Sequence, residues 1–136
     1  NLKIKKIMRH KLDKVVESKN IISYEKVVDV FKSGKNLFNE GKMYESYEKW
    51  EVIWKYGDPC LRKDIKGFLQ LSGGLWNRHL GKMKSVKYLL NKANQNINKS
   101  TLFVENINKE CIIQQITIEL NKNMNIKSSY NTNFKI

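Results

Sequence analysis

The tripeptide Gly-Lys-Met occurs twice in residues 37–93, as Gly41-Lys42-Met43 and Gly81-Lys82-Met83, and this stretch decides the fold. Each copy lies between two segments whose apolar residues recur at helical spacing, and glycine is the residue that most often ends a helix. The pattern therefore predicts two helical hairpins hinged at the glycines. Short connections make consecutive helices pack side by side, so we predict an all-α fold, a compact array of about six antiparallel helices.

The same periodicity divides the chain into three parts. We expect residues 1–20 to form a basic helix and residues 23–122 to form the helical domain. Residues 123–136, rich in Asn, Ser and Lys, are expected to be a flexible tail. Inside the domain we expect helices over 23–41, 43–56, 61–80, 83–97 and 108–122. The last of these should bury Cys111, Ile112, Ile116 and Leu120.

Composition supports this architecture and excludes others. A length of 136 residues fits one domain, and one Pro with seven Gly is too few turn residues for a sandwich or barrel. No apolar run has the length of a membrane span, and we expect no membrane partner. Cys60 and Cys111 follow neither a metal-binding nor a disulfide spacing, so we expect thiols in a reducing compartment.

The net charge of +13 first suggests a nucleic-acid ligand. However, only Arg9, Arg62 and Arg78 are arginines, and the lysine excess accompanies an excess of Asn and Ile. These three residue types have AT-rich codons, which favours coding bias and a plastid location, with the cytoplasm as the alternative. RNA is therefore a possible partner that we do not favour. RNA binding would require lysines gathered on one face with exposed aromatic rings.

A polar cluster is predicted beside the first hinge. In the helix over 43–56, Met43, Tyr47, Trp50 and Trp54 point to the core, and Glu48 and Glu51 lie on the flank of that stripe. In the next helix Lys66, Gln70 and Asn77 form a polar stripe, opposite an apolar face that ends in Trp76 and His79. Because a buried carboxylate needs a partner, we expect Glu51 to be largely buried and paired with Lys66, Gln70 or a Tyr hydroxyl. The hypothetical ligand-binding cluster is Tyr47, Glu48, Glu51, Lys66, Gln70 and Asn77.

At these residues the chain resembles the family called domain of unknown function 309. The run from Phe38 to Trp54, FNEGKMYESYEKWEVIW, is similar to the family motif Phe-Asn-x-Gly followed by Glu-Ala-His-Glu-x-x-Glu-x-x-Trp. The run from Lys66 to Asn77, KGFLQLSGGLWN, resembles the family's Gln-Gly-Leu-Ile-Gln-Leu-Ala-Ala-Ala-Leu-Tyr-His. The resemblance covers roughly residues 31–120. It implies a compact helical fold, and the biochemical role of the family is not settled.

Three departures from the motif bear on function. Tyr47 and Asn77 stand where the family has histidines, and Lys66 stands where it has glutamine. Without imidazoles, Glu48 and Glu51 with the two amides would form an all-oxygen set, suited at best to Mg or Mn. We therefore expect no metal, no cofactor and no catalytic residue.

Three functions remain open from the sequence. We favour a non-catalytic interaction or scaffold domain, or one that binds a small polar ligand, with another protein as the possible partner. The second function is an enzyme that uses Glu48 and Glu51. The third is a basic RNA-associated protein that uses the lysine-rich amino-terminal segment and the tail.

Overall fold

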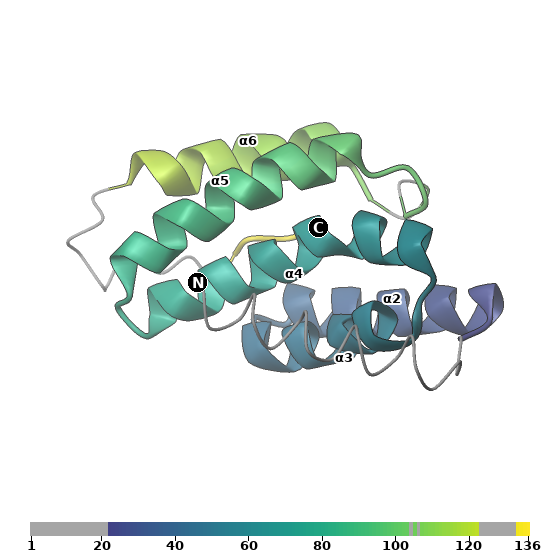
Figure 1. Cartoon of the computed structure of the whole chain (residues 1–136). Coiled ribbons are helices and arrows are strands. Elements are labelled where there is room, and N and C mark those ends of the chain that lie inside the picture. The colour runs from purple at the N-terminus through teal and green to yellow at the C-terminus, as the bar shows by residue number, and fades with distance from the viewer. Residues whose placement is uncertain (1–21, 104, 106, 123–132) are drawn as a thin grey trace.

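Five helices make up the part of the chain that the computed structural model describes, which is residues 22–103, 105, 107–122 and 133–136 (Figure 1). They are α2 (Tyr24–Asn39), α3 (Met43–Tyr56), α4 (Pro59–His79), α5 (Met83–Lys99) and α6 (Lys109–Asn121). No strand occurs in these residues, so the predicted all-helical fold is confirmed. None of these helices is long and apolar enough to cross a membrane. The basic segment predicted over 1–20 lies outside the described residues.

Both hinges end a helix in the same way. Gly41 and Gly81 have φ angles of 81° and 79°, a left-handed conformation that glycine adopts without steric cost. One residue later, the Lys42 amide donates to the Leu37 carbonyl and the Lys82 amide donates to the Asn77 carbonyl. This six-to-one hydrogen bond caps the carbonyl end of a helix. The repeated tripeptide therefore encodes one turn used twice.

The start of α4 differs from the prediction. The sequence suggested that Gly57-Asp58-Pro59 is a break and that the helix begins near Leu61. In the structure Asp58 is the N-cap, its Oδ1 accepting from the Leu61 amide at 2.9 Å, and Pro59 is the first helical residue. Proline fits the first turn because its missing N–H has no helical acceptor there.

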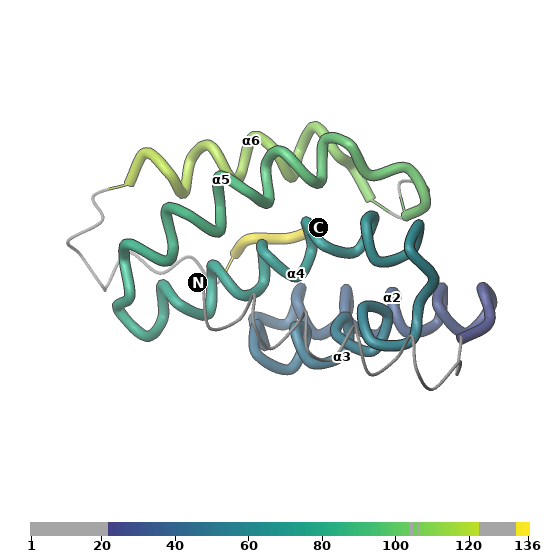
Figure 2. The backbone as a smooth tube through the Cα atoms, viewed as in Figure 1, coloured from purple at the N-terminus to yellow at the C-terminus, as the bar shows by residue number. Residues whose placement is uncertain are grey.

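Helix α4 lies in the middle of the described fold. Helix α3 packs on one side of it and α5 on the other, with α2 beside α3 and α6 beside α5 (Figures 1 and 2). Most residues of α4 are buried, as expected for a helix that is covered on two sides. A Cβ at Gly67 would lie 2.7 Å from the Ile97 backbone nitrogen, and one at Gly74 would lie 3.0 Å from Leu90 Cδ2. The absence of side chains at these glycines lets α5 approach closely.

A cluster of aromatic rings lies in the core under these helices. Trp50 is fully buried, its indole N–H donates to the Phe31 carbonyl at 3.1 Å, and its ring packs over Gly34. Phe31 also stacks on Phe103, with the ring centroids 4.4 Å apart. Phe68 of α4 meets the Phe31 ring edge to face at 5.0 Å. These contacts join α2, α3, α4 and the segment after α5 into one core.

A buried ion pair connects α6 to α4. The Nε of Arg78 lies 3.2 Å from Glu119 Oε2, and both side chains are fully buried. Lys122 Nζ lies 2.6 Å from the other oxygen of Glu119. The inward face of α6 is therefore Ile112, Ile116 and Glu119, and the predicted burial of Cys111 is wrong because its side chain is exposed.

The last four residues pack against the helices, in contrast to the expected flexibility of 123–136. Phe134 is fully buried and meets the Phe38 ring edge to face at 5.5 Å. The Asn39 side chain donates to the Ile136 carbonyl at 2.9 Å and accepts from the Ile136 amide at 2.8 Å. The buried Phe134 ring and the hydrogen bonds to Asn39 thus dock this segment on the end of α2. Residues 123–132 lie outside the described residues.

The first testable prediction compares two helical glycines. A Cβ at Gly34 would lie 2.3 Å from Trp50 Nε1, so Gly34→Ala should displace the buried indole and destabilise the protein by about 1–3 kcal/mol. At Gly73 the nearest atom would be 3.7 Å away, an ordinary contact. Gly73→Ala should therefore stabilise the protein by up to about 1 kcal/mol, because alanine favours the helix. Urea unfolding followed by circular dichroism measures both, and equal effects would contradict this packing.

The second prediction concerns the buried ion pair. Glu119→Leu leaves the Arg78 charge buried without its carboxylate and should destabilise the protein by about 3–5 kcal/mol. The double variant Arg78→Met with Glu119→Leu removes both charges and should be nearly as stable as the wild type. Thermal unfolding of the single and double variants tests this coupling. Additive losses would contradict it.

Candidate functional site

The polar cluster has Tyr47 at its centre. Its ring lies against Gly73, where a Cβ would be 3.7 Å from Tyr47 Cδ2, and its hydroxyl donates a hydrogen bond to the Glu51 carboxylate. Burial raises the pKa of Tyr47 most, followed by the negative charge of Glu51, the hydrogen bond to Glu51 and the nearby Tyr44. Tyr47 is therefore a neutral donor that holds Glu51 one turn further along α3.

Glu51 is less buried than predicted. The sequence indicated a largely buried carboxylate, whereas the side chain is half-buried in the structure. A Tyr hydroxyl was one of its three predicted partners, and in the structure Tyr47 supplies this hydrogen bond. Lys66, another predicted partner, is exposed on α4, and Glu48 is exposed on α3. The Tyr47 ring thus packs against α4 at Gly73, and the carboxylate of Glu51 lies at the edge of this contact.

The two amides of the predicted cluster are buried. Gln70 Oε1 accepts a hydrogen bond from Asn96 Nδ2 of α5 at 2.7 Å, so Gln70 joins α4 to α5. This differs from the expected orientation toward α3. Asn77 is 4% exposed, and its Nδ2 has no hydrogen-bond partner among the described residues. One buried donor is therefore open to a water molecule or a small polar ligand.

An aromatic surface lies next to this cluster, and the sequence did not identify it as a site. Tyr44 is 47% exposed, and its ring centroid lies 5.5 Å from that of Trp76. The Trp76 ring stacks on His79 at 5.2 Å. The sequence placed Trp76 and His79 on the apolar face of α4, but Trp76 is half-buried and His79 is exposed. The high aromatic content of a small helical domain was the only signal of such a surface.

These residues together form a surface that we call the α3–α4 seam: Tyr44, Glu48 and Glu51 of α3 with Trp76 and His79 of α4. Tyr44, Glu48 and Glu51 lie on one stripe because they are separated by four and three residues. In the described part of the chain, no group of His, Cys, Asp and Glu is arranged to hold a metal ion. The seam therefore offers rings and carboxylates to a partner.

The third prediction follows from the raised pKa of Tyr47. The unfolded chain releases the phenolic proton near the ordinary pKa of 10.0, whereas the folded protein retains it at higher pH. The stability that protonated Tyr47 contributes is complete below pH 10 and is lost as the pH rises above it. The urea midpoint of the wild type should therefore fall more steeply above pH 10 than that of Tyr47→Phe, which should be about 1 kcal/mol less stable at neutral pH. Tyr56→Phe, at an exposed position of α3, is the control and should keep the wild-type slope.

Comparison with known proteins gives one match. A search of curated proteins and a search of solved structures found no significant similarity. A family model described as domain of unknown function (DUF309) matches residues 31–89, from the middle of α2 to the first half of α5. The matched region includes both hinges, the Tyr47–Glu51 pair and the whole of α4. Residues 31–89 of this chain are thus similar to the DUF309 family, in agreement with the resemblance of the motifs in this region.

Proposed function

We propose that the protein is a non-catalytic interaction domain that binds a cationic peptide segment of another protein at the α3–α4 seam. The observation that carries this proposal is the continuous aromatic surface formed by Tyr44, Trp76 and His79 beside the carboxylates of α3. Tyrosine and tryptophan are enriched at the centres of protein interfaces. Their rings give a large contact area at little cost in conformational entropy.

The chemistry of the partner follows from the side chains of the seam. The faces of tyrosine and tryptophan rings attract a guanidinium or ammonium group, and carboxylates bind the same groups through charge-assisted hydrogen bonds. Tyr44 and Trp76 supply the rings, and Glu48 is an exposed carboxylate one turn after Tyr44. An arginine or lysine side chain that enters the seam would meet both kinds of group.

The Tyr47–Glu51 hydrogen bond supports this assignment by fixing one of the carboxylates before binding. Glu51 is oriented by a phenol that packs on Gly73, so less rotamer freedom is lost when a cation binds. A small polar ligand is the second candidate, favoured by the Nδ2 of buried Asn77, which has no hydrogen-bond partner among the described residues. The lysine, asparagine and isoleucine excess supports a plastid as the location of this function.

The fourth prediction tests the seam with a fluorescein-labelled octapeptide of alternating glycine and arginine. Tyr44→Ser with Glu48→Gln removes one ring and one carboxylate. Removal of the ring alone should cost about 1 kcal/mol of binding free energy, which corresponds to about fivefold weaker binding. We therefore expect the affinity to fall at least fivefold in a fluorescence anisotropy titration.

The matched control variant is Tyr56→Ser with Glu45→Gln, which changes the same residue types at exposed positions elsewhere on α3. It should bind like the wild type. Equal losses in the two variants would contradict the proposal, since the peptide would then respond to overall charge. An octapeptide of alternating glycine and acetyl-lysine, which has no cationic side chains, should bind weakly to all three proteins.

A further inference from the structure

The hairpin of α4 and α5 has an unusual charge distribution. Between Pro59 and Phe103, Asp64 is the only acidic residue, whereas lysines and arginines are frequent. Asp64 is 7% exposed, so its charge is turned away from solvent. Its Oδ2 accepts hydrogen bonds from the Thr101 amide at 2.9 Å, from the Leu102 amide and from the Ser100 hydroxyl. The outer surface of α5 therefore carries cations with no carboxylate of the same hairpin beside them.

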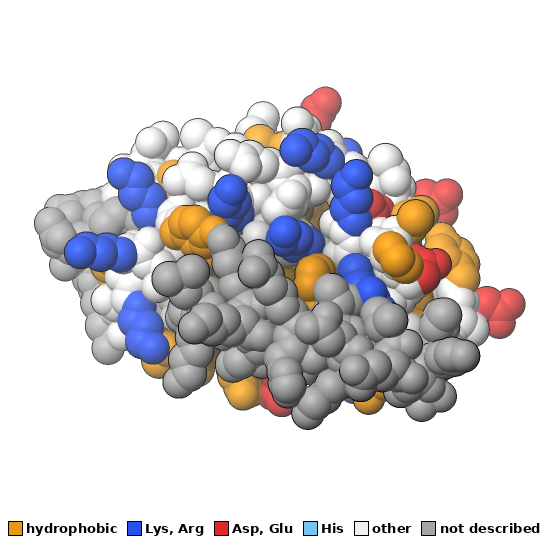
Figure 3. Space-filling view, viewed as in Figure 1, with side chains coloured by type: hydrophobic (Ala, Val, Ile, Leu, Met, Phe, Trp, Pro, Cys, Tyr) orange, Lys and Arg blue, Asp and Glu red, His pale blue; other side chains and the backbone are white. Residues whose placement is uncertain are grey.

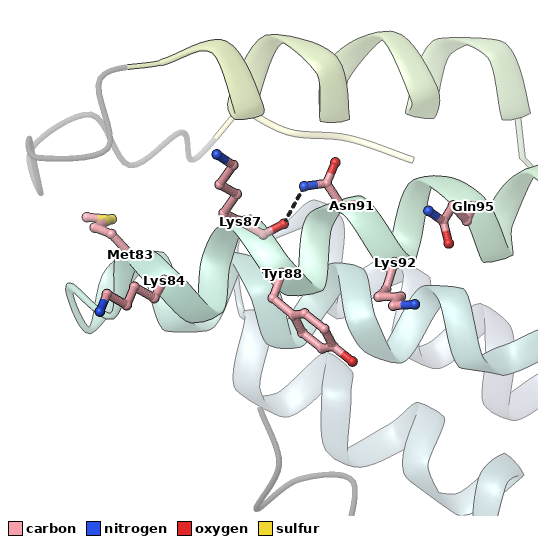
Figure 4. Close-up of a pocket in the computed structure, with 7 residues that line it drawn as sticks. All are labelled: Met83, Lys84, Lys87, Tyr88, Asn91, Lys92 and Gln95. Carbon is pink, nitrogen blue, oxygen red and sulfur yellow. Dashed lines mark hydrogen bonds between the residues drawn. The ribbon is translucent and has the colours of Figure 1, made fainter.

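The exposed side of α5 presents two rows of side chains. Lys84, Tyr88 and Lys92 are four residues apart and form one row, in which Lys92 Nζ lies 5.9 Å from the centroid of the Tyr88 ring. The second row contains Lys87 and the amides of Asn91 and Gln95. In Figure 4, Tyr88 points downward from α5, whereas Lys87 and Asn91 point upward. The Asn91 side chain donates to the Lys87 carbonyl at 2.9 Å.

A shallow groove of about 570 Å³ runs along these rows. The described residues that line it are Met83, Lys84, Lys87, Tyr88, Asn91, Lys92 and Gln95, all from α5. Within the described chain, the three lysines of the groove make no ion pair with a carboxylate. Figure 3 shows lysine and arginine side chains spread over this face of the molecule, whereas most of the visible acidic side chains lie at its edge.

We propose that the outer face of α5 binds single-stranded nucleic acid. Charge complementarity selects a polyanion, and the order lysine, tyrosine, lysine places a ring between two phosphate-binding groups. Proteins that bind single strands combine such a basic track with aromatic rings on which bases stack. Lys84 and Lys92 are separated by about 12 Å along the helix axis, which corresponds to three or four phosphates at about 3.4 Å per stacked nucleotide.

The side chains between the lysines favour a single strand over a duplex or an acidic peptide. A base in a duplex is already stacked and cannot cover the Tyr88 ring, and a glutamate-rich peptide has no ring to stack there. Tyr88 is 36% exposed. Asn91 and Gln95 carry both a hydrogen-bond donor and an acceptor, which suits the edges of unpaired bases. The dominance of lysine over arginine is consistent with binding that does not depend on sequence.

The fifth prediction is tested with fluorescein-labelled oligouridylate of fifteen nucleotides, by anisotropy at about 50 mM salt. Replacing Lys84, Lys87 and Lys92 with glutamine should weaken binding by about tenfold or more. It should also reduce the slope of log affinity against log salt concentration by about 2, since each phosphate contact on a single strand contributes about 0.7. Tyr88→Leu should weaken binding about fivefold or more, and Tyr88→Phe should retain it.

The matched control replaces Lys26, Lys32 and Lys49, which are exposed on α2 and α3, with glutamine. It makes the same change in net charge and should leave affinity within about twofold of the wild type. Equal losses in the two triple variants would overturn the proposal, as would equal affinity for a duplex of the same length. Competition by oligoglutamate as effective as that by oligouridylate would also overturn it, in favour of an acidic protein. Unchanged thermal midpoints confirm that the variants fold.

Discussion

The burial of α4 on nearly every side is the constraint on which this fold depends. A helix in that position has little solvent-facing surface on which to place polar groups, so most of its buried polar groups need a partner inside the protein. Arg78 meets Glu119, Gln70 meets Asn96, and Asp64 meets the backbone after α5. These partners come from α5, α6 and their connections. The polar groups of α4 thus determine where the later helices lie.

Helix boundaries were predictable because they are local. The hinge glycines, the N-cap at Ser23 and the extent of α3 follow from residues within a few positions of each boundary. The start of α4 was missed by two residues because Pro59 was interpreted as a break alone, although proline also begins helices. In each case the residues within about one helical turn of the boundary decide where the helix begins or ends.

Polar partners were harder to predict because they join distant parts of the chain. The Tyr47–Glu51 hydrogen bond spans one helical turn, and helical spacing placed a Tyr hydroxyl among the three possible partners of Glu51. Gln70 lies on the same helical stripe as Lys66, yet Gln70 is buried against α5 and Lys66 is exposed. The rotation of α4 about its own axis decides between these outcomes. That rotation results from packing against α3 and α5 at once, and it cannot be predicted from the periodicity of the α4 sequence alone.

The inward orientation of Asp64 has a consequence for the electric field around the molecule. In residues 23–58 acidic and basic side chains are nearly equal in number, whereas the next hairpin encloses its only carboxylate and exposes its lysines. The described domain therefore has a permanent dipole moment directed from the α2–α3 hairpin toward the α4–α5 hairpin. In the field of a large anion such a molecule experiences a torque while still several ångströms from contact. It would arrive with α5 already facing the charge, so that fewer encounters are lost to wrong orientations.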